Sequence, residues 1–160
     1  MSDEDRAATQ HSALSTHRSS GRVLGIDPGE RRVGVALSDE LGLLATPLTI
    51  IERRSWVADV AAIAALVRAH DVTEVVVGHP KTLRGEIGPQ ARRAERFARE
   101  VSRAVSVPVR LWDERYSTIE AAERLAHEGG RARRRHPGSR GHPDAAAAAV
   151  ILQGYLDSRR

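Results

Sequence analysis

Cysteine is absent from this chain, which excludes disulfide bonds and thiolate zinc sites. Any bound metal must therefore rely on carboxylate, imidazole or water ligands. Aromatic residues make up only 3% of the sequence, so the core must be mostly aliphatic and few rings are available to stack on nucleic-acid bases. Lysine is almost missing too, because Lys81 is the only one among 25 basic residues.

Long apolar runs are also missing. No stretch approaches the roughly 20 apolar residues that span a bilayer, and the polar residues 1–21 lack the apolar segment of a secretory signal. We therefore expect a cytoplasmic protein with no membrane partner and a disordered leader over residues 1–21. The net charge of +4 and the pI near 10.5 permit attraction to a polyanion without requiring it.

A length of 160 residues suits one domain, which we place at residues 22–158, with one active site. The first part of that domain has three β-branched or aliphatic runs, at residues 22–27, 31–39 and 43–50. Turn-like residues separate these runs. The pattern predicts a three-stranded antiparallel meander.

The middle of the chain alternates helix and strand patterns. Apolar residues recur at helical spacing over 55–69 and again from Pro89, where Phe97 is part of the stripe. Between and after them lie two short β-rich runs, residues 74–80 and 108–112. This β-α-β-α-β order predicts that the fourth and fifth strands are parallel.

The last part predicts two helices joined by a basic loop. Ser117 followed three residues later by Glu120 is a capping-box pattern, and that helix should stop at Gly129. Residues 129–143 hold five arginines and no carboxylate, which indicates a mobile loop, and a final helix should run from Pro143 to about Leu156. The fold class is thus mixed α/β, with a five-stranded sheet flanked by helices.

Four acidic residues stand where two-metal hydrolysis of a phosphodiester would need carboxylates. Asp27 ends the first strand, Asp113 and Glu114 end the fifth, and Asp144 begins the last helix. Each also has an ordinary interpretation: a plain Asp-Pro-Gly turn, solvated residues before a helix, and complementarity to a helix dipole. The topology brings all three places to one scaffold, which favours the joint interpretation.

The sequence also resembles a family over nearly all of its folded length. Four segments in order are similar to signature blocks of the YqgF/RuvX family: GIDPGERRVGVALSD (25–39), VVVGHPKTLRGEIGPQA (75–91), LWDERYSTIEA (111–121) and DAAAAAVILQGYL (144–156). Proteins of this family are named both as Holliday-junction resolvases and as pre-16S rRNA nucleases. The resemblance implies a ribonuclease-H-like fold, dependence on Mg²⁺ or Mn²⁺, and a catalytic, metal-binding set of Asp27, Glu114 and Asp144.

Under this resemblance we expect Asp27 to be shared between ions and the other two carboxylates to complete their coordination. Asp113 is the reserve candidate for the ligand on the fifth strand. His79 stands where the family usually has Leu, and Pro28 and Tyr116-Ser117 are further departures that remove no carboxylate. His79 could bind phosphate or transfer a proton, although a loop histidine is more often simply solvated.

Basic side chains flank the proposed site, so we expect them to grip a phosphate backbone. The predicted nucleic-acid contacts are Lys81, Arg84, Arg115, Arg131, Arg133, Arg134 and Arg135. The partner is either structured RNA, in processing of the 5′ end of precursor 16S rRNA, or branched DNA, in recombination and repair. A homodimer would suit a DNA junction, but the sequence has no interface signature.

Two other classes compete with a nuclease. Actin-like and sugar-kinase ATPases share an Asp-x-Gly hairpin, but they need two such domains and usually have a hydroxyl residue at the position of Glu30. A non-catalytic nucleic-acid-binding or assembly module would keep the fold without the chemistry. The complete carboxylate set favours the enzyme.

Overall fold

The computed structural model describes residues 21–82, 84–116 and 143–160. The strands are β1 (Arg22–Pro28), β2 (Arg32–Ser38), β3 (Ala45–Glu52), β4 (Val72–His79) and β5 (Val109–Asp113). The helices are α1 (Trp56–Ala69), α2 (Pro89–Ala104), the 3-10 helix η3 (Glu114–Tyr116) and α4 (Pro143–Ser158). The predicted helix from Ser117, the basic loop at 129–143 and nearly all of the predicted leader lie outside the described residues.

The five strands form one sheet in the order β3-β2-β1-β4-β5. The pairs β1–β2 and β2–β3 are antiparallel, whereas β4 pairs in parallel with both β1 and β5. The predicted meander and the predicted parallel pair are therefore confirmed. One consequence matters for the site: β1, β3, β4 and β5 all end at the same edge of the sheet, which we call the site edge.

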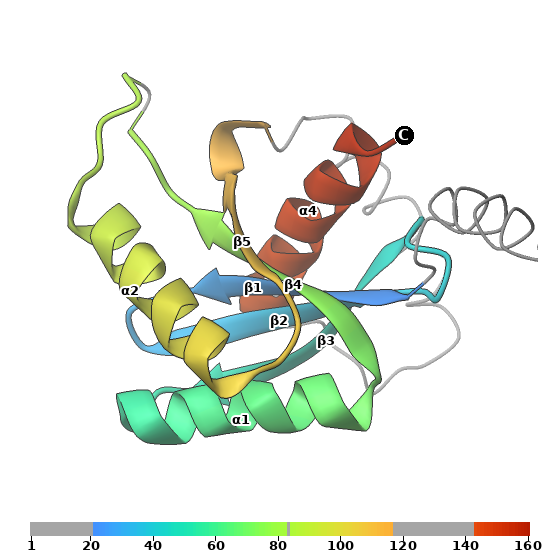
Figure 1. The fold of residues 1–160 in the computed structure, drawn as a ribbon. Coiled ribbons are helices and arrows are strands. Elements are labelled where there is room, and N and C mark those ends of the chain that lie inside the picture. The colour runs from blue at the N-terminus through green and yellow to red at the C-terminus, as the bar shows by residue number, and fades with distance from the viewer. Residues whose placement is uncertain (1–20, 83, 117–142) are drawn as a thin grey trace, which may run out of the picture.

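Helices cover both faces of this sheet (Figure 1). Helices α1 and α2 lie on one face over Leu24, Ile26 and the larger core cluster, and α4 lies on the other face over Val23 and a smaller cluster. Because side chains alternate along a strand, successive residues of β1, β4 or β5 contact α1 and α2 on one face of the sheet and α4 on the other. None of the helices in the described ranges is long and apolar enough to cross a membrane.

The predicted helical stripes are buried as expected. Val60, Ile63 and Val67 of α1 are buried, and so are Phe97 and Val101 of α2. Helix α1 begins after Ser55, whose hydroxyl accepts a hydrogen bond from the backbone N–H of Ala58, so the helix starts where the apolar spacing predicted.

Helix α4 lies very close to the sheet at its first turn. A Cβ on Gly34 of β2 would overlap the backbone oxygen of Asp144, so glycine permits the approach. At the far end of the helix, the carboxylate of Glu74 on β4 accepts hydrogen bonds from the Tyr155 hydroxyl and from Arg159 Nη1, the latter at 2.9 Å. These contacts fix both ends of α4 and therefore place Asp144.

The predicted bounds differ from the structure by one or two residues at strand ends. Strand β4 begins at Val72 rather than at residue 74 because Arg22 and Val72 already pair there. Strand β5 extends to Asp113 because that residue pairs with His79, and α4 continues to Ser158.

Candidate active site

Asp27 lies near the end of β1, directly opposite Gly34 of β2. By the alternation of β1, its side chain shares the face of Gly25, over which α4 packs. The carboxyl is half-buried. Burial raises its pKa above the ordinary value, and the negative charge of Asp144 raises it further.

Asp144 occupies the first turn of α4, where its backbone oxygen lies over Gly34. The Arg32 guanidinium approaches its carboxylate, with Nη1 4.0 Å from Oδ2. Arg32 begins β2 on the same face as Gly34. The close approach of α4 to the sheet therefore brings the carboxyl groups of two distant segments, Asp144 and Asp27, into electrostatic contact.

The sheet separates the two candidates that follow one another at the end of β5. Asp113 pairs with His79 and Trp112 pairs with Gly78, so Asp113 shares the α2 side of the sheet with His79. Glu114 lies in the next turn and returns toward the α4 side. A Cβ on Gly78 would come within 2.7 Å of Glu114 Oε1, which shows that the Glu114 carboxylate rests against this glycine.

The carboxylate of Asp113 is paired with two basic side chains. Arg115 Nη2 donates to its Oδ2 at 2.6 Å, and Lys81 Nζ lies 3.8 Å from the same oxygen. The hydrogen bond from Arg115 is the main cause that lowers the pKa of Asp113 below its ordinary value. This carboxylate is thus paired with two predicted phosphate-binding side chains on the α2 side of the sheet.

Glu114 has the opposite environment. Its pKa is raised to about 7, first by burial and then by the charges of Asp27 and Asp113. Asp27 thus belongs to two repelling pairs, one with Asp144 and one with Glu114. Concentrated negative charge of this kind is the donor chemistry that suits a hard divalent cation.

The cradle for these carboxylates consists of small residues. Gly34 lies beneath Asp144, and Gly78 lies beneath Glu114. In the present side-chain positions, no three acidic or histidine residues of the described ranges are gathered tightly enough to hold an ion. The fit to a divalent ion therefore rests on the carboxylate donor chemistry and on the close packing at the two glycines.

The other predicted contacts have different places. His79 is buried on the α2 side of the sheet, where its Nε2 lies 3.0 Å from Glu95 Oε1, so the structure does not bring it to Asp27. Lys81 and Arg115 lie around Asp113, and Arg84 is exposed in the loop before α2. The arginines predicted at 131, 133, 134 and 135 lie outside the described residues.

Sequence reasoning missed Arg32 and the two cradle glycines. The contact of Arg32 with Asp144 joins residues far apart in the chain, which no local pattern shows. The position of Gly34 opposite Asp27 follows from strand register. A signal was nevertheless present, because small residues within otherwise β-branched strands often mark a close approach of another backbone.

Comparison with known proteins decides the family. A family model described as "RuvX: Holliday junction resolvase" matches residues 21–158. The chain belongs to the RuvX family. Among RuvX relatives, a Syntrophus aciditrophicus protein is 49% identical over 137 residues, covering 86% of this chain and 89% of its own length. A Carboxydothermus hydrogenoformans protein is 45% identical, covering 85% and 96%. Both are provisionally named pre-16S rRNA nucleases.

Solved structures agree on the fold. Thermus thermophilus RuvC in complex with a Holliday junction substrate superposes with a TM-score of 0.62 at 17% identity, covering 86% of this chain and 95% of that chain. The Fowlpox virus resolvase with Holliday junction DNA gives 0.52 at 12% identity, with coverage of 86% and 98%. The predicted ribonuclease-H-like fold is confirmed. As a RuvX family member, this chain is a nuclease, a hydrolase of phosphodiester bonds.

Proposed function

We propose that Asp27, Glu114 and Asp144 hold divalent metal, Mg²⁺ or Mn²⁺, and that the enzyme processes the 5′ end of precursor 16S rRNA there. The observation behind this proposal is that Asp144 packs over Gly34, the residue opposite Asp27, and that Glu114 rests against Gly78 on the same face of the sheet. In agreement with this placement, burial and charges within the carboxylate set raise the pKa of Asp27 and of Glu114. Resolvase and ribonuclease-H-like nucleases generally use divalent metals. The three proposed ligands come from three separate elements, β1, η3 and α4, so they can surround an ion from different sides.

A bound divalent cation supplies Lewis-acid stabilisation of the phosphoryl oxygens and a more acidic water. Asp27 interacts with both other members, because the charge of Asp144 raises the pKa of Asp27 and the charge of Asp27 raises the pKa of Glu114. Arg32 restrains Asp144. Lys81 and Arg115, which both contact Oδ2 of Asp113, would pair with phosphates of the substrate near the scissile bond.

The choice of RNA rests on the curated relatives, which share 45–49% identity with this chain over most of its length. The alternative is a DNA endonuclease acting on branched junctions, which the description of the family model favours. Both substrates present the same phosphodiester group. Their separation needs a direct comparison.

The test incubates one enzyme preparation with labelled RNA containing the 16S 5′ leader and with a four-way DNA junction, in Mg²⁺ or Mn²⁺. We expect metal-dependent cleavage of the RNA, abolished by EDTA, and a loss of about 10²–10³-fold in Glu114→Gln, the cost typical of removing one transition-state stabilising group. The matched control is Glu40→Gln, which removes an exposed carboxylate beyond the end of β2, at the sheet edge opposite Asp27. It should cleave at the wild-type rate.

Three outcomes count against the proposal. Cleavage of the junction alone would replace the RNA by the DNA substrate. Full activity in EDTA would show that cleavage needs no divalent metal. Equal losses in Glu114→Gln and Glu40→Gln would show that the Glu114 carboxylate has no special part.

A further inference from the structure

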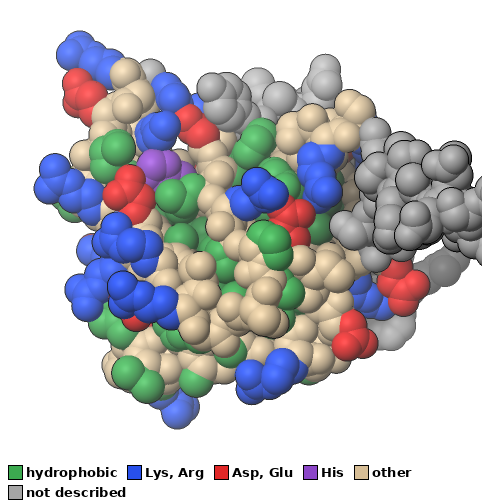
Figure 2. Space-filling model, in the orientation of Figure 1, with side chains coloured by type: hydrophobic (Ala, Val, Ile, Leu, Met, Phe, Trp, Pro, Cys, Tyr) green, Lys and Arg blue, Asp and Glu red, His purple; other side chains and the backbone are tan. Residues whose placement is uncertain are grey.

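Helix α2 presents arginines along its whole outer side. Arg92, Arg96, Arg99 and Arg103 follow one another at i, i+4, i+7 and i+11, and all four are exposed. At 100° per residue these positions fall on one narrow line, opposite the buried Ala94, Phe97 and Val101. We call this line the α2 arginine stripe. Figure 2 shows Lys and Arg side chains gathered over this helix and the loop before it.

The stripe starts at the site edge. Strand β4 ends there at His79, and α2 begins at Pro89 after a short loop that includes Lys81 and Arg84. Arg93 of the first turns reaches the β1–β2 turn, with Nη2 3.4 Å from Glu30 Oε1. Basic groups thus continue from the neighbourhood of the carboxylates down the length of α2.

The stability of α2 does not account for the stripe. Like charges spaced three or four residues apart on a helix repel one another, and the helix pairs only part of this charge. Glu100 accepts a hydrogen bond from Arg103 at 3.1 Å, and Glu95 is turned toward His79. A ligand that brings negative charge would relieve this repulsion.

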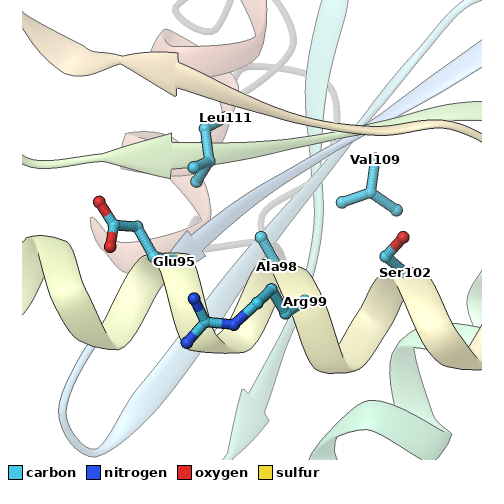
Figure 3. A pocket seen from close by; sticks show the side chains of 6 residues that line it. All are labelled: Glu95, Ala98, Arg99, Ser102, Val109 and Leu111. Atoms are coloured by element: carbon cyan, nitrogen blue, oxygen red, sulfur yellow. The ribbon is translucent and has the colours of Figure 1, made fainter.

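Two arginines of the stripe have defined surroundings. The Arg96 guanidinium lies 4.6 Å from the centre of the Trp56 ring, on which Arg53 also stacks at 5.2 Å. Arg99 lines a shallow groove between α2 and β5, together with Ser102, Val109 and Leu111 (Figure 3). Stacking restrains the side chain of Arg96, so less conformational entropy is lost when it pairs with a phosphate.

We propose that the α2 arginine stripe binds the phosphodiester backbone of the substrate beyond the scissile bond. The four arginines extend over about 16 Å of helix, and a duplex strand presents a phosphate about every 3.4 Å along its axis. The stripe therefore matches a run of several phosphates. A second copy of this chain does not fit as the occupant, because a two-fold contact would set like charges against each other.

This inference rests on the nuclease acting at the site edge, and its test measures binding separately from cleavage. Labelled 16S-leader RNA and a four-way DNA junction are titrated in EDTA, by fluorescence anisotropy, across a range of salt concentrations. The variant Arg92→Gln/Arg96→Gln/Arg99→Gln keeps helix propensity and removes three charges. The matched control removes three charges from the opposite edge, Arg22→Gln/Arg68→Gln/Arg160→Gln.

We expect the stripe variant to bind at least tenfold more weakly at 0.1 M salt, and its log–log salt slope to be smaller by about 2, since each phosphate contact contributes about 0.7–0.9. The control triple should stay within about twofold of wild type. The probe for which the stripe variant loses affinity, RNA or DNA junction, identifies the nucleic acid that the stripe binds. Equal losses in both triples, or none in the stripe variant, would overturn the inference, as would wild-type protein that binds neither probe.

Hydrogen exchange on the wild-type protein provides a second measurement that needs no variant. Amides of residues 89–104 should gain protection when RNA or junction is bound, and unchanged exchange there with bound nucleic acid would contradict the stripe. Cleavage kinetics separate this inference from the proposed function. The stripe variant should raise KM and keep kcat, whereas wild-type protein that binds through the stripe and never cleaves would overturn the proposed function alone.

Discussion

Replacing Asp27 by Asn is expected to reduce cleavage by about 10³-fold or more while making the metal-free protein more resistant to heat. The rate falls because Asp27 is the carboxylate that interacts with both Glu114 and Asp144, and losing a charge at the reacting centre costs at least as much as losing one neutral hydrogen-bond donor. The stability rises because the substitution removes a half-buried charge and its repulsion from Asp144.

Both effects are measured on one preparation, by single-turnover cleavage with Mn²⁺ and by thermal unfolding in EDTA. Added Mn²⁺ should raise the melting temperature of the wild type, because a ligand that binds only the folded state stabilises it, and should leave Asp27→Asn nearly unchanged. Glu40→Gln is the control for both assays and should resemble wild type. An Asp27→Asn enzyme that is inactive but still stabilised by Mn²⁺ would place the metal elsewhere.

Glu114 should make the stability of the metal-free protein depend on pH in an unusual direction. Its pKa is about 7 in the folded chain against an ordinary value of 4.5, so between these values the folded state holds a proton that the unfolded state has released. Stability contributed at this site therefore falls as pH rises through that window and stays low above it. Screening of this half-buried group reduces the expected loss to about 1–2 kcal/mol.

The measurement compares thermal unfolding of wild type and Glu114→Gln in EDTA from pH 4 to pH 8. Groups common to both proteins cancel, so the difference should be small at pH 4 and should grow in favour of the variant toward pH 8. A proton that competes for Glu114 also lowers Mn²⁺ affinity by about tenfold per pH unit below 7. A difference independent of pH would contradict the assigned environment of Glu114.

The chain order and layers of this fold were predictable because they depend on local patterns. The alternation in residues 22–50 and the apolar spacing around Val60 and Phe97 each reflect short-range physics. The start of β4 and the end of β5 differ from their predicted positions, because pairing with Arg22 and with His79 extends these strands. Pairing is a property of the assembled sheet, and no single segment encodes it.

The site was predictable as a set of acidic candidates but not as a geometry. Choosing between Asp113 and Glu114 needs the register of β4 against β5, which decides the side of the sheet that each one occupies. The same register places His79 on the α2 side of the sheet, where it contacts Glu95 and not Asp27. The spacing of the α2 arginine stripe was readable in the sequence, but its meaning depends on where the helix starts relative to the site edge.

The most direct test of the account is a crystal structure of the protein with Mn²⁺, with anomalous scattering recorded at the manganese edge. We predict anomalous density among the carboxylates of Asp27, Glu114 and Asp144 in the wild type, and its loss in crystals of Asp27→Asn. Manganese bound at Asp113 instead, or protein that cleaves RNA with Mn²⁺ while these three carboxylates hold no ion, would contradict the assignment.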